Sequence, residues 1–158
     1  MTAEAECPSE VALAECVVSA LFERDNASQA LGMKIEAAGP GMARVSMRVR
    51  SDMLNGHHTC HGGIIFALAD SAFAFACNSR NEASVASACH IDYLEPSHEG
   101  DVLLAEAIEQ ALAGRLGVYD ISVTNQAGRT IALFRGKSIQ LKREVVREPA
   151  IGEKSHAP

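Results

Sequence analysis

One carboxylate, Asp70, stands in an otherwise apolar segment of this 158-residue chain. The residues around it are apolar on every side of a helix predicted over 62–79, and such a helix is expected to be buried. An ionised carboxylate there is costly unless it is paired, hydrogen-bonded or facing a cavity. The polar, glycine-rich residues 55–63 lead into the N-terminus of this helix, where backbone N–H groups favour anions. An acid close to an anion-stabilising backbone predicts an acyl-transfer site.

The spacing of Gly62 and Asp70 predicts that this site is shared between two chains. The two residues are eight positions apart, which is ~12 Å along a helix. Groups that act on one carbonyl must lie within ~3 Å of the reacting atoms. One helix therefore cannot supply both groups to one carbonyl, whereas two antiparallel copies can. We expect a site at a two-fold dimer interface, with Gly62 from one protomer and Asp70 from its partner.

Each residue of this constellation has a chemical role and a plainer alternative. The N–H of Gly62 or Gly63 would stabilise an oxyanion, while Asp70 would attack the carbonyl or activate water as a general base. Asn55 could orient the water or the substrate. The alternatives are a carboxylate satisfied by backbone or arginine, a plain turn at Asn55-Gly56, and a glycine pair that only starts the helix.

The histidines and the cysteine of the same loop do not predict a metal site. His57, His58, Cys60 and His61 lie within five residues, too close together for one tetrahedral zinc site. A thiol nucleophile is disfavoured, because the adjacent side chains of Cys60 and His61 rarely meet. His61 is instead expected to hydrogen-bond to backbone and to shape the loop. The chain has no G-x-S-x-G elbow, G-x-G-x-x-G motif or Walker loop, and no cofactor is expected.

Composition argues against several other classes of function. The net charge of −6 and the lack of a basic stripe disfavour a nucleic-acid partner. No run of 18 apolar residues predicts a transmembrane helix, so no membrane partner is expected. The acidic N-terminal residues lack the basic start of a signal peptide. Free thiols in a reducing cytoplasm are expected of the five cysteines, Cys7, Cys16, Cys60, Cys77 and Cys89.

The elements that would position the site follow from periodicity and turn residues. A helix is predicted over 9–24, a turn at 39–41 between two strands, and the buried helix over 62–79. Short turns separate the later segments, which predicts mainly an antiparallel meander. The strands are expected at 44–50, 85–94, 101–112, 116–124 and 130–141, of which 101–112 also suits a helix. We predict an α+β fold, a curved antiparallel sheet wrapped around a central buried helix, as one domain over 1–142 with a flexible tail over 143–158.

Residues 55–63, followed by 68–74, resemble the hotdog acyl-CoA thioesterases, most closely the PaaI type of phenylacetate degradation. Segments 91–96, 117–120 and 132–138 resemble the same type. The resemblance implies that Asp70 is the nucleophile or base, that Gly62 provides the oxyanion N–H and that Asn55 positions substrate or water. It also implies ring-hydroxylated phenylacetyl-CoA as substrate and a homotetramer built from two dimers. His61 and Gly63 are the candidates for substrate binding.

Two other functions stay open at this point. A hotdog enoyl-thioester hydratase or dehydratase pairs a histidine with an acid near the central helix, and His61 could serve there. A non-catalytic acyl-CoA-binding module would keep the fold without turnover. Some relatives also place a serine or threonine helper early in the strand after the buried helix, where this chain has residues 84–87 and no helper can be assigned.

Overall fold

The computed structural model describes residues 9–147, which form three α-helices, a short 3-10 helix and six strands. The helices are α1 (Glu10–Arg24), α2 (Asn26–Ala30) and α3 (Gly62–Asn78), and η1 (Ser51–Met53) is the 3-10 turn before α3. The strands are β1 (Lys34–Gly39), β2 (Met42–Arg48), β3 (Glu82–Tyr93), β4 (Val102–Ala113), β5 (Leu116–Thr124) and β6 (Thr130–Glu144). None of the helices within this part of the chain is long and apolar enough to span a membrane.

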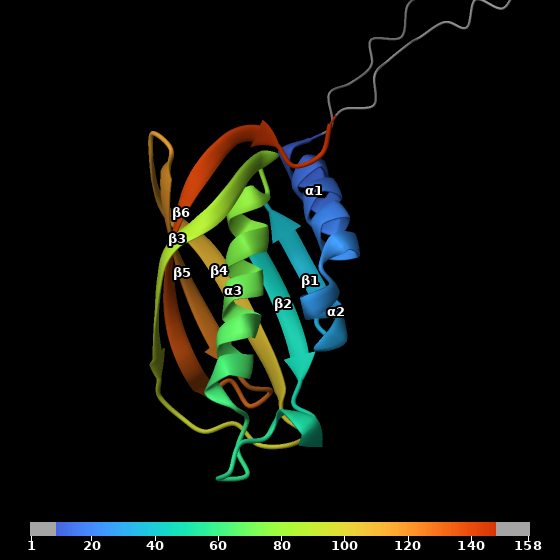
Figure 1. Cartoon of the computed structure of the whole chain (residues 1–158), viewed down its shortest axis with the longest axis vertical. Helices are drawn as coiled ribbons and strands as arrows, with labels where there is room; N and C mark the ends of the chain where they lie inside the picture. The colour runs from blue at the N-terminus through green and yellow to red at the C-terminus, as the bar shows by residue number, and fades with distance from the viewer. Residues whose placement is uncertain (1–8, 148–158) are drawn as a thin grey trace, which may run out of the picture.

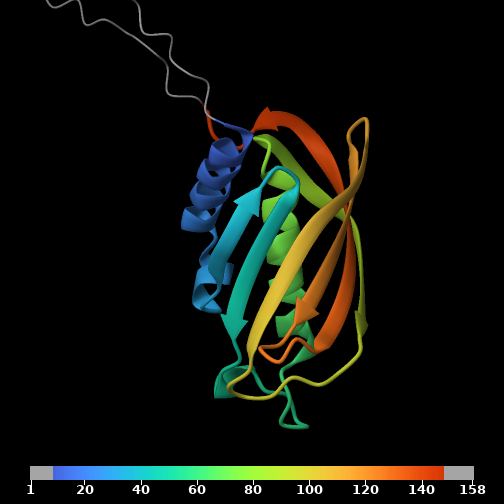
Figure 2. The same ribbon diagram turned by 180° about the vertical axis from the view of Figure 1, so that it is seen from behind.

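One six-stranded sheet curves around α3, as predicted (Figures 1 and 2). Every strand pair is antiparallel and the order is β1-β2-β4-β5-β6-β3. The segment with helix-like composition, 101–112, is strand β4. The predicted meander holds only for β4, β5 and β6, because β3 pairs with β6 at the far edge. The connection over 94–101 passes below the N-terminal end of α3 and carries the chain across to β4, a crossing that turn signals alone do not reveal.

The central helix α3 packs its apolar faces against the concave side of the sheet. The helix lies against β2, β3, β4, β5 and β6. Burial on all sides, as predicted, is wrong for one stripe, which the described elements cover only in part. We call this stripe the open face of α3; its residues are half-buried or exposed and recur at helical spacing, at Gly63, Phe66, Ala67, Asp70, Ser71 and Ala74.

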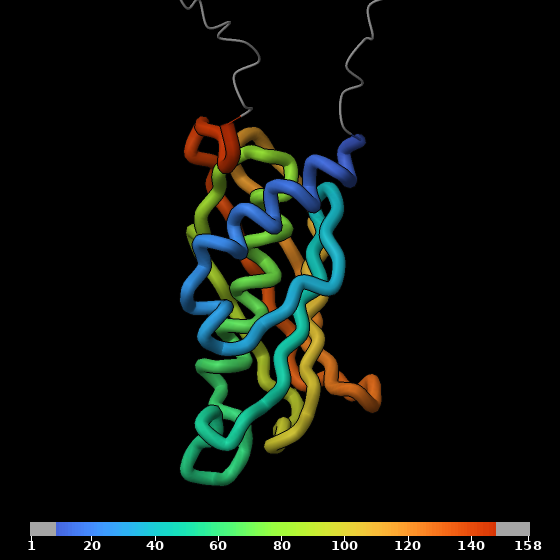
Figure 3. Tube along the Cα trace, turned by 90° about the vertical axis from the view of Figure 1, so that its right-hand side faces the viewer, coloured from blue at the N-terminus to red at the C-terminus, as the bar shows by residue number. Residues whose placement is uncertain are grey.

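The N-terminal helices cover the opposite edge of the sheet from β3. Ser9 caps α1 by accepting a hydrogen bond from the Ala12 N–H at 3.2 Å. Helix α1 packs on β1 and crosses α3 (Figure 3). The sequence did not predict α2, a five-residue helix capped by Asp25. Thus β1 is covered by a helix, whereas the 12-residue strand β3 is a bare edge.

The last described residues carry a strand end and hydrogen bonds in part of the segment predicted as a flexible tail. Strand β6 continues to Glu144, two residues past the predicted boundary at 142. Asn81 then fastens the following residues: its Oδ1 accepts from the N–H groups of Val145 and Val146, at 3.2 and 2.9 Å. The part of the tail over 148–158, like Cys7, lies outside the described residues.

Candidate active site

The loop before α3 is organised by the side chain of Asn55. Its Oδ1 accepts hydrogen bonds from the His57 N–H at 2.8 Å and the Thr59 N–H at 3.3 Å, and its Nδ2 donates to Thr59 Oγ1 at 3.1 Å. These contacts close residues 55–59 into a tight turn, with His58 in the left-handed region at φ 59°. Asn55 therefore holds this loop in shape. Its proposed contact with water or substrate would be made from the same loop.

His61 caps α3 and thereby distinguishes the two glycines. Its Nδ1 accepts a hydrogen bond from the Gly63 N–H at 2.9 Å, which agrees with the predicted bond from His61 to backbone. No acceptor within residues 9–147 lies in hydrogen-bonding range of the Gly62 N–H. Of the two oxyanion donors considered, Gly62 is therefore the free one, at the positive end of a 17-residue helix.

Tyr93, at the end of β3, holds the first turn of α3 in place. Its hydroxyl donates to the Gly62 carbonyl at 2.8 Å, and a Cβ on Gly62 would lie 3.1 Å from the Tyr93 Cζ. Gly62 and Asn55 line one cleft of about 290 Å³ together with Tyr93 and Glu95. Sequence analysis assigned no role to Tyr93, although this residue lies in a segment that carries the family resemblance.

Asp70 lies two turns further along α3, on its open face. Burial raises the pKa of the Asp70 carboxyl, and the negative charge of Asp25 raises it further. The Cys89 thiol, on β3, lies with Sγ 4.0 Å from Asp70 Oδ1. A carboxylate with a raised pKa is a better proton acceptor near neutral pH, which suits a general base. No hydrogen bond in the described chain joins Asp70 to His61, so the acid–histidine pair of a hydratase is not formed there.

Within one chain the predicted residues fall into two separate groups. Asn55, His61, Gly62 and Gly63 gather at the N-terminal end of α3, whereas Asp70 is absent from the lining of their cleft. The neighbours of Asp70, namely Asp25 and Cys89, come from other elements. No local pattern marks these neighbours, because they approach α3 only through the tertiary fold.

The cysteine and metal alternatives find no support in the geometry. Burial and the nearby Asp101 raise the pKa of the Cys60 thiol to about 11, which keeps it protonated near neutral pH. In the described part of the chain, no group of three or more histidine, cysteine or acidic side chains is placed to hold a metal ion. Cys16, Cys60, Cys77 and Cys89 are free thiols.

Comparison with known proteins decides the family. The family model described as the thioesterase superfamily matches residues 57–132. The acyl-coenzyme A thioesterase PaaI of Escherichia coli (strain K12) is 52% identical over 119 residues, 75% of this chain and 85% of the relative. The chain belongs to the thioesterase superfamily.

Among solved structures, this thioesterase is similar in fold to the same relative. The structure of Escherichia coli PaaI, from the phenylacetic acid degradation operon, has a TM-score of 0.85 at 47% identity and covers 86% of this chain and 99% of that chain. A thioesterase from Streptococcus pneumoniae TIGR4, solved with coenzyme A, has a TM-score of 0.73 at 26% identity, covering 78% and 96%. The predictions of the hotdog fold and of a thioester hydrolase of the PaaI type are confirmed.

Proposed function

We propose that this thioesterase hydrolyses ring-hydroxylated phenylacetyl-CoA and related aryl-CoA thioesters to the free acid and CoA. The 52% identity to Escherichia coli PaaI supports the acyl-CoA class. The relation of that protein to the phenylacetic acid degradation operon supports the aryl group. The observation that carries the reaction type is the pairing of a free Gly62 N–H at a helix N-terminus with the half-buried acid Asp70.

The proposed mechanism uses one group from each of two protomers. The thioester carbonyl oxygen accepts a hydrogen bond from Gly62 N–H of one protomer, where the helix N-terminus stabilises the developing negative charge. Asp70 of its partner attacks the carbonyl carbon or takes a proton from the attacking water. Asn55 orients the water or the carbonyl from the loop beside Gly62. On the general-base route, the CoA thiolate leaves as the carbonyl re-forms, which gives the acid directly. On the nucleophilic route, its departure leaves a mixed anhydride on Asp70, and water hydrolyses this anhydride to the free acid and the restored carboxylate. On either route the thiolate takes up the proton that the water releases.

The proposed dimer forms along strand β3. This edge strand and the residue after it expose apolar side chains, with Val85 46%, Tyr93 50% and Leu94 54% exposed, and the open face of α3 lies beside the strand. Pairing two β3 edges across a two-fold axis would cover the unpaired backbone and bring two open faces together. The family resemblance further implies a tetramer of two such dimers. The free cysteines fit the proposed location in the cytoplasm.

A panel of acyl-CoA thioesters tests this proposal. Free-thiol release is measured for phenylacetyl-CoA, its 3-hydroxy and 4-hydroxy derivatives, benzoyl-CoA, a medium-chain acyl-CoA and an enoyl-CoA. The expected result is the highest kcat/KM on the hydroxylated phenylacetyl thioesters. Hydration of the enoyl-CoA without thiol release would contradict the proposed reaction, and a preference for the aliphatic thioester would contradict the proposed substrate.

A further inference from the structure

A chain of hydrogen bonds connects a second carboxylate to the residue that follows Asp70. Asp25, between α1 and α2, accepts from the Ser28 N–H at 3.0 Å through Oδ1 and from the Ser28 hydroxyl at 2.5 Å through Oδ2. The Ser28 Oγ lies 2.8 Å from the Ser71 Oγ on α3. Ser28 is only 2% exposed, so water does not compete for these bonds. We call these three residues the Asp25 relay.

The direction of each bond in the Asp25 relay is fixed by chemistry. An ionised carboxylate only accepts, so the single hydroxyl proton of Ser28 is committed to Asp25. The bond between the two serines must then be donated by Ser71. With its proton used in this way, Ser71 has only lone pairs left for any further partner. The relay therefore makes Ser71 an obligate acceptor toward the open face of α3.

Ser71 lies on α3 between Asp70 and Ala74, and it is Ala74, not Ser71, that lines a nearby groove. Ser71 follows Asp70 on the open face, and Ala74, one turn further on, neighbours both residues. Ala74 and Asp25 line a groove of about 530 Å³ between α1 and β3, within the usual size of a small-molecule site. Its apolar lining comes from Leu21, Ala74, Phe75, Ala83, Val85, Leu141 and Val145, and the charged side chains of Arg24, Arg143 and Glu144 line it as well.

We propose that this groove takes the aryl part of the acyl group and that Ser71 accepts a hydrogen bond from a ring hydroxyl. With the thioester carbonyl at Asp70, an acyl group directed along α3 passes Ser71 before it enters the groove. A ring hydroxyl supplies the donor that the Asp25 relay demands, whereas an unsubstituted ring leaves Ser71 unpaired. The relay is thus a specificity element that favours hydroxylated over unsubstituted aryl thioesters. This inference rests on the proposed function and names the residues that would set its substrate preference.

The test compares kcat/KM for 4-hydroxyphenylacetyl-CoA, 3-hydroxyphenylacetyl-CoA and phenylacetyl-CoA in one set of full-length variants. Because all three substrates use the same Asp70, the ratio of kcat/KM values cancels any general effect on the chemistry. Ser71→Ala removes the acceptor, and the ratio of the better hydroxylated substrate to phenylacetyl-CoA should fall about three- to tenfold. Ser46→Ala is the matched control, because it removes a serine hydroxyl that donates to another side chain, Glu36 at 2.5 Å, on the outer face of β2. Its ratio should match the wild type.

Asp25→Asn provides a second variant that reverses the relay without removing the cap of α2. The amide oxygen of asparagine still accepts from the Ser28 N–H, while its NH₂ group now donates to the Ser28 hydroxyl. Ser28 then donates to Ser71, which frees the Ser71 proton to face the groove. The hydroxyl preference should fall as in Ser71→Ala, and 4-methoxyphenylacetyl-CoA, which offers only an acceptor, should gain relative to phenylacetyl-CoA.

The outcomes separate this inference from the proposed function. Wild-type ratios in both variants would overturn the role of the Asp25 relay while leaving thioester hydrolysis intact. Equal losses on all three substrates in Ser71→Ala would also overturn it, because Ser71 would then serve the attacking water. A wild-type enzyme that hydrolyses none of these thioesters would refute the proposed function itself, and the inference with it.

Discussion

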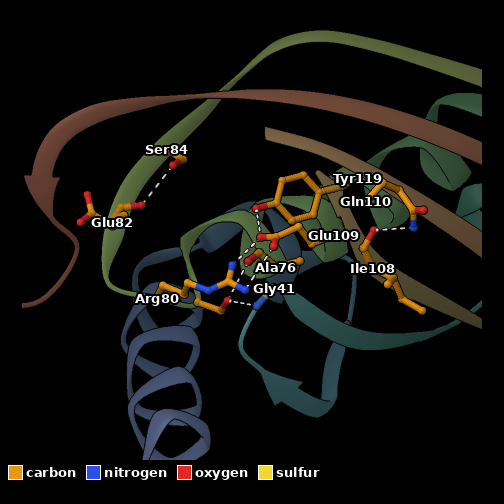
Figure 4. Close-up of polar contacts among 10 residues, drawn as sticks. Gly41, Ala76, Arg80, Glu82, Ser84, Ile108, Glu109, Gln110 and Tyr119 are labelled. Atoms are coloured by element: carbon orange, nitrogen blue, oxygen red, sulfur yellow. Dashed lines mark hydrogen bonds and ion pairs between the residues drawn. The ribbon is translucent and has the colours of Figure 1, made fainter. Parts of the chain in front are cut away.

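The two ends of α3 are built in opposite ways. At the C-terminal end, Arg80 forms an ion pair with Glu109, and the Tyr119 hydroxyl donates to the same carboxylate at 2.9 Å (Figure 4). Ser79 accepts from the Gly41 N–H and donates to the Ala76 carbonyl, both at 2.8 Å. These side chains find partners in their own chain, which fastens this end of the helix to β4, β5 and the turn before β2.

The N-terminal end leaves one group free. His61 satisfies Gly63 and Tyr93 satisfies the Gly62 carbonyl, yet the Gly62 N–H finds no acceptor in the described chain. An unsatisfied donor at a helix end is usually filled by a cap, water or a ligand. The contrast shows that one end of α3 is fastened to its own chain, while the other is held in shape around a free donor, which we propose binds a substrate oxygen.

Removing the free donor should give the largest loss of activity. Gly62→Pro deletes the N–H at the first helical position, where proline fits, and His61 before it already has the extended backbone that proline requires (φ −61°, ψ 132°). We expect kcat to fall about 10²- to 10³-fold, as for the loss of one oxyanion donor. Gly62→Ala is the control, since it brings the same Cβ toward Tyr93 but keeps the N–H. Equal losses in both variants would assign the effect to crowding instead.

Asp70→Asn should lower kcat by at least ~10², because the base or nucleophile is removed while the shape is kept.

The Asp70→Asn substitution should also raise the melting temperature at neutral pH. The pKa of Asp70 is raised in the folded state, so ionisation costs the wild type stability as the pH rises through that titration. The stability difference should vanish well below pH 4, where wild-type Asp70 is protonated in both states. Asp120→Asn, at a carboxylate that pairs with Arg135 on the outer face of the sheet, is the control for kcat. Near-normal turnover in Asp70→Asn would refute its role.

Tyr119→Phe tests the C-terminal end of α3. Tyr119 is 1% exposed, and burial together with Glu109 raises the pKa of its hydroxyl. Losing its bond to the carboxylate should lower the free energy of unfolding by about 1.5–3 kcal/mol. Because this end lies away from the free donor, kcat should stay within about twofold of wild type. Chemical denaturation and steady-state kinetics give both values, and a large loss of kcat without a loss of stability would break the comparison.

Tyr93→Phe makes the same chemical change at the opposite end and should give the opposite pattern. The exposed Tyr93 hydroxyl bonds only the Gly62 carbonyl, so the free energy of unfolding should change by less than about 1 kcal/mol. The first turn of α3 would lose its anchor, and kcat should fall several-fold. A stability loss as large as that of Tyr119→Phe, with unchanged kcat, would show that both ends are merely structural.

The sequence predicted the parts of this enzyme that depend on local pattern. The lone acid in an apolar helix and the glycine-rich helix entry indicated Asp70 and Gly62 as candidates, whose roles stay predictions, and strand periodicity identified the wrapped sheet. The position of β3 at the edge was missed, because a connection of eight residues can reach several places in a sheet. The Asp25 relay was missed because Ser28 and Ser71 are 43 residues apart and meet only in the folded chain. Burial of α3 on all sides was expected because a sequence cannot distinguish a face covered by its own sheet from an open one.

The central claim is that each active site takes Asp70 from one chain and Gly62 from another. Asp70→Asn chains and Gly62→Pro chains, each inactive alone, are refolded together and the mixed dimer is isolated by two different affinity tags. One site of that dimer is then wholly wild type and the other carries both lesions. The account predicts about half of the activity of a wild-type dimer, if the two sites act independently. No recovery in mixed dimers confirmed by mass spectrometry would contradict it and would place both residues of each site in one chain.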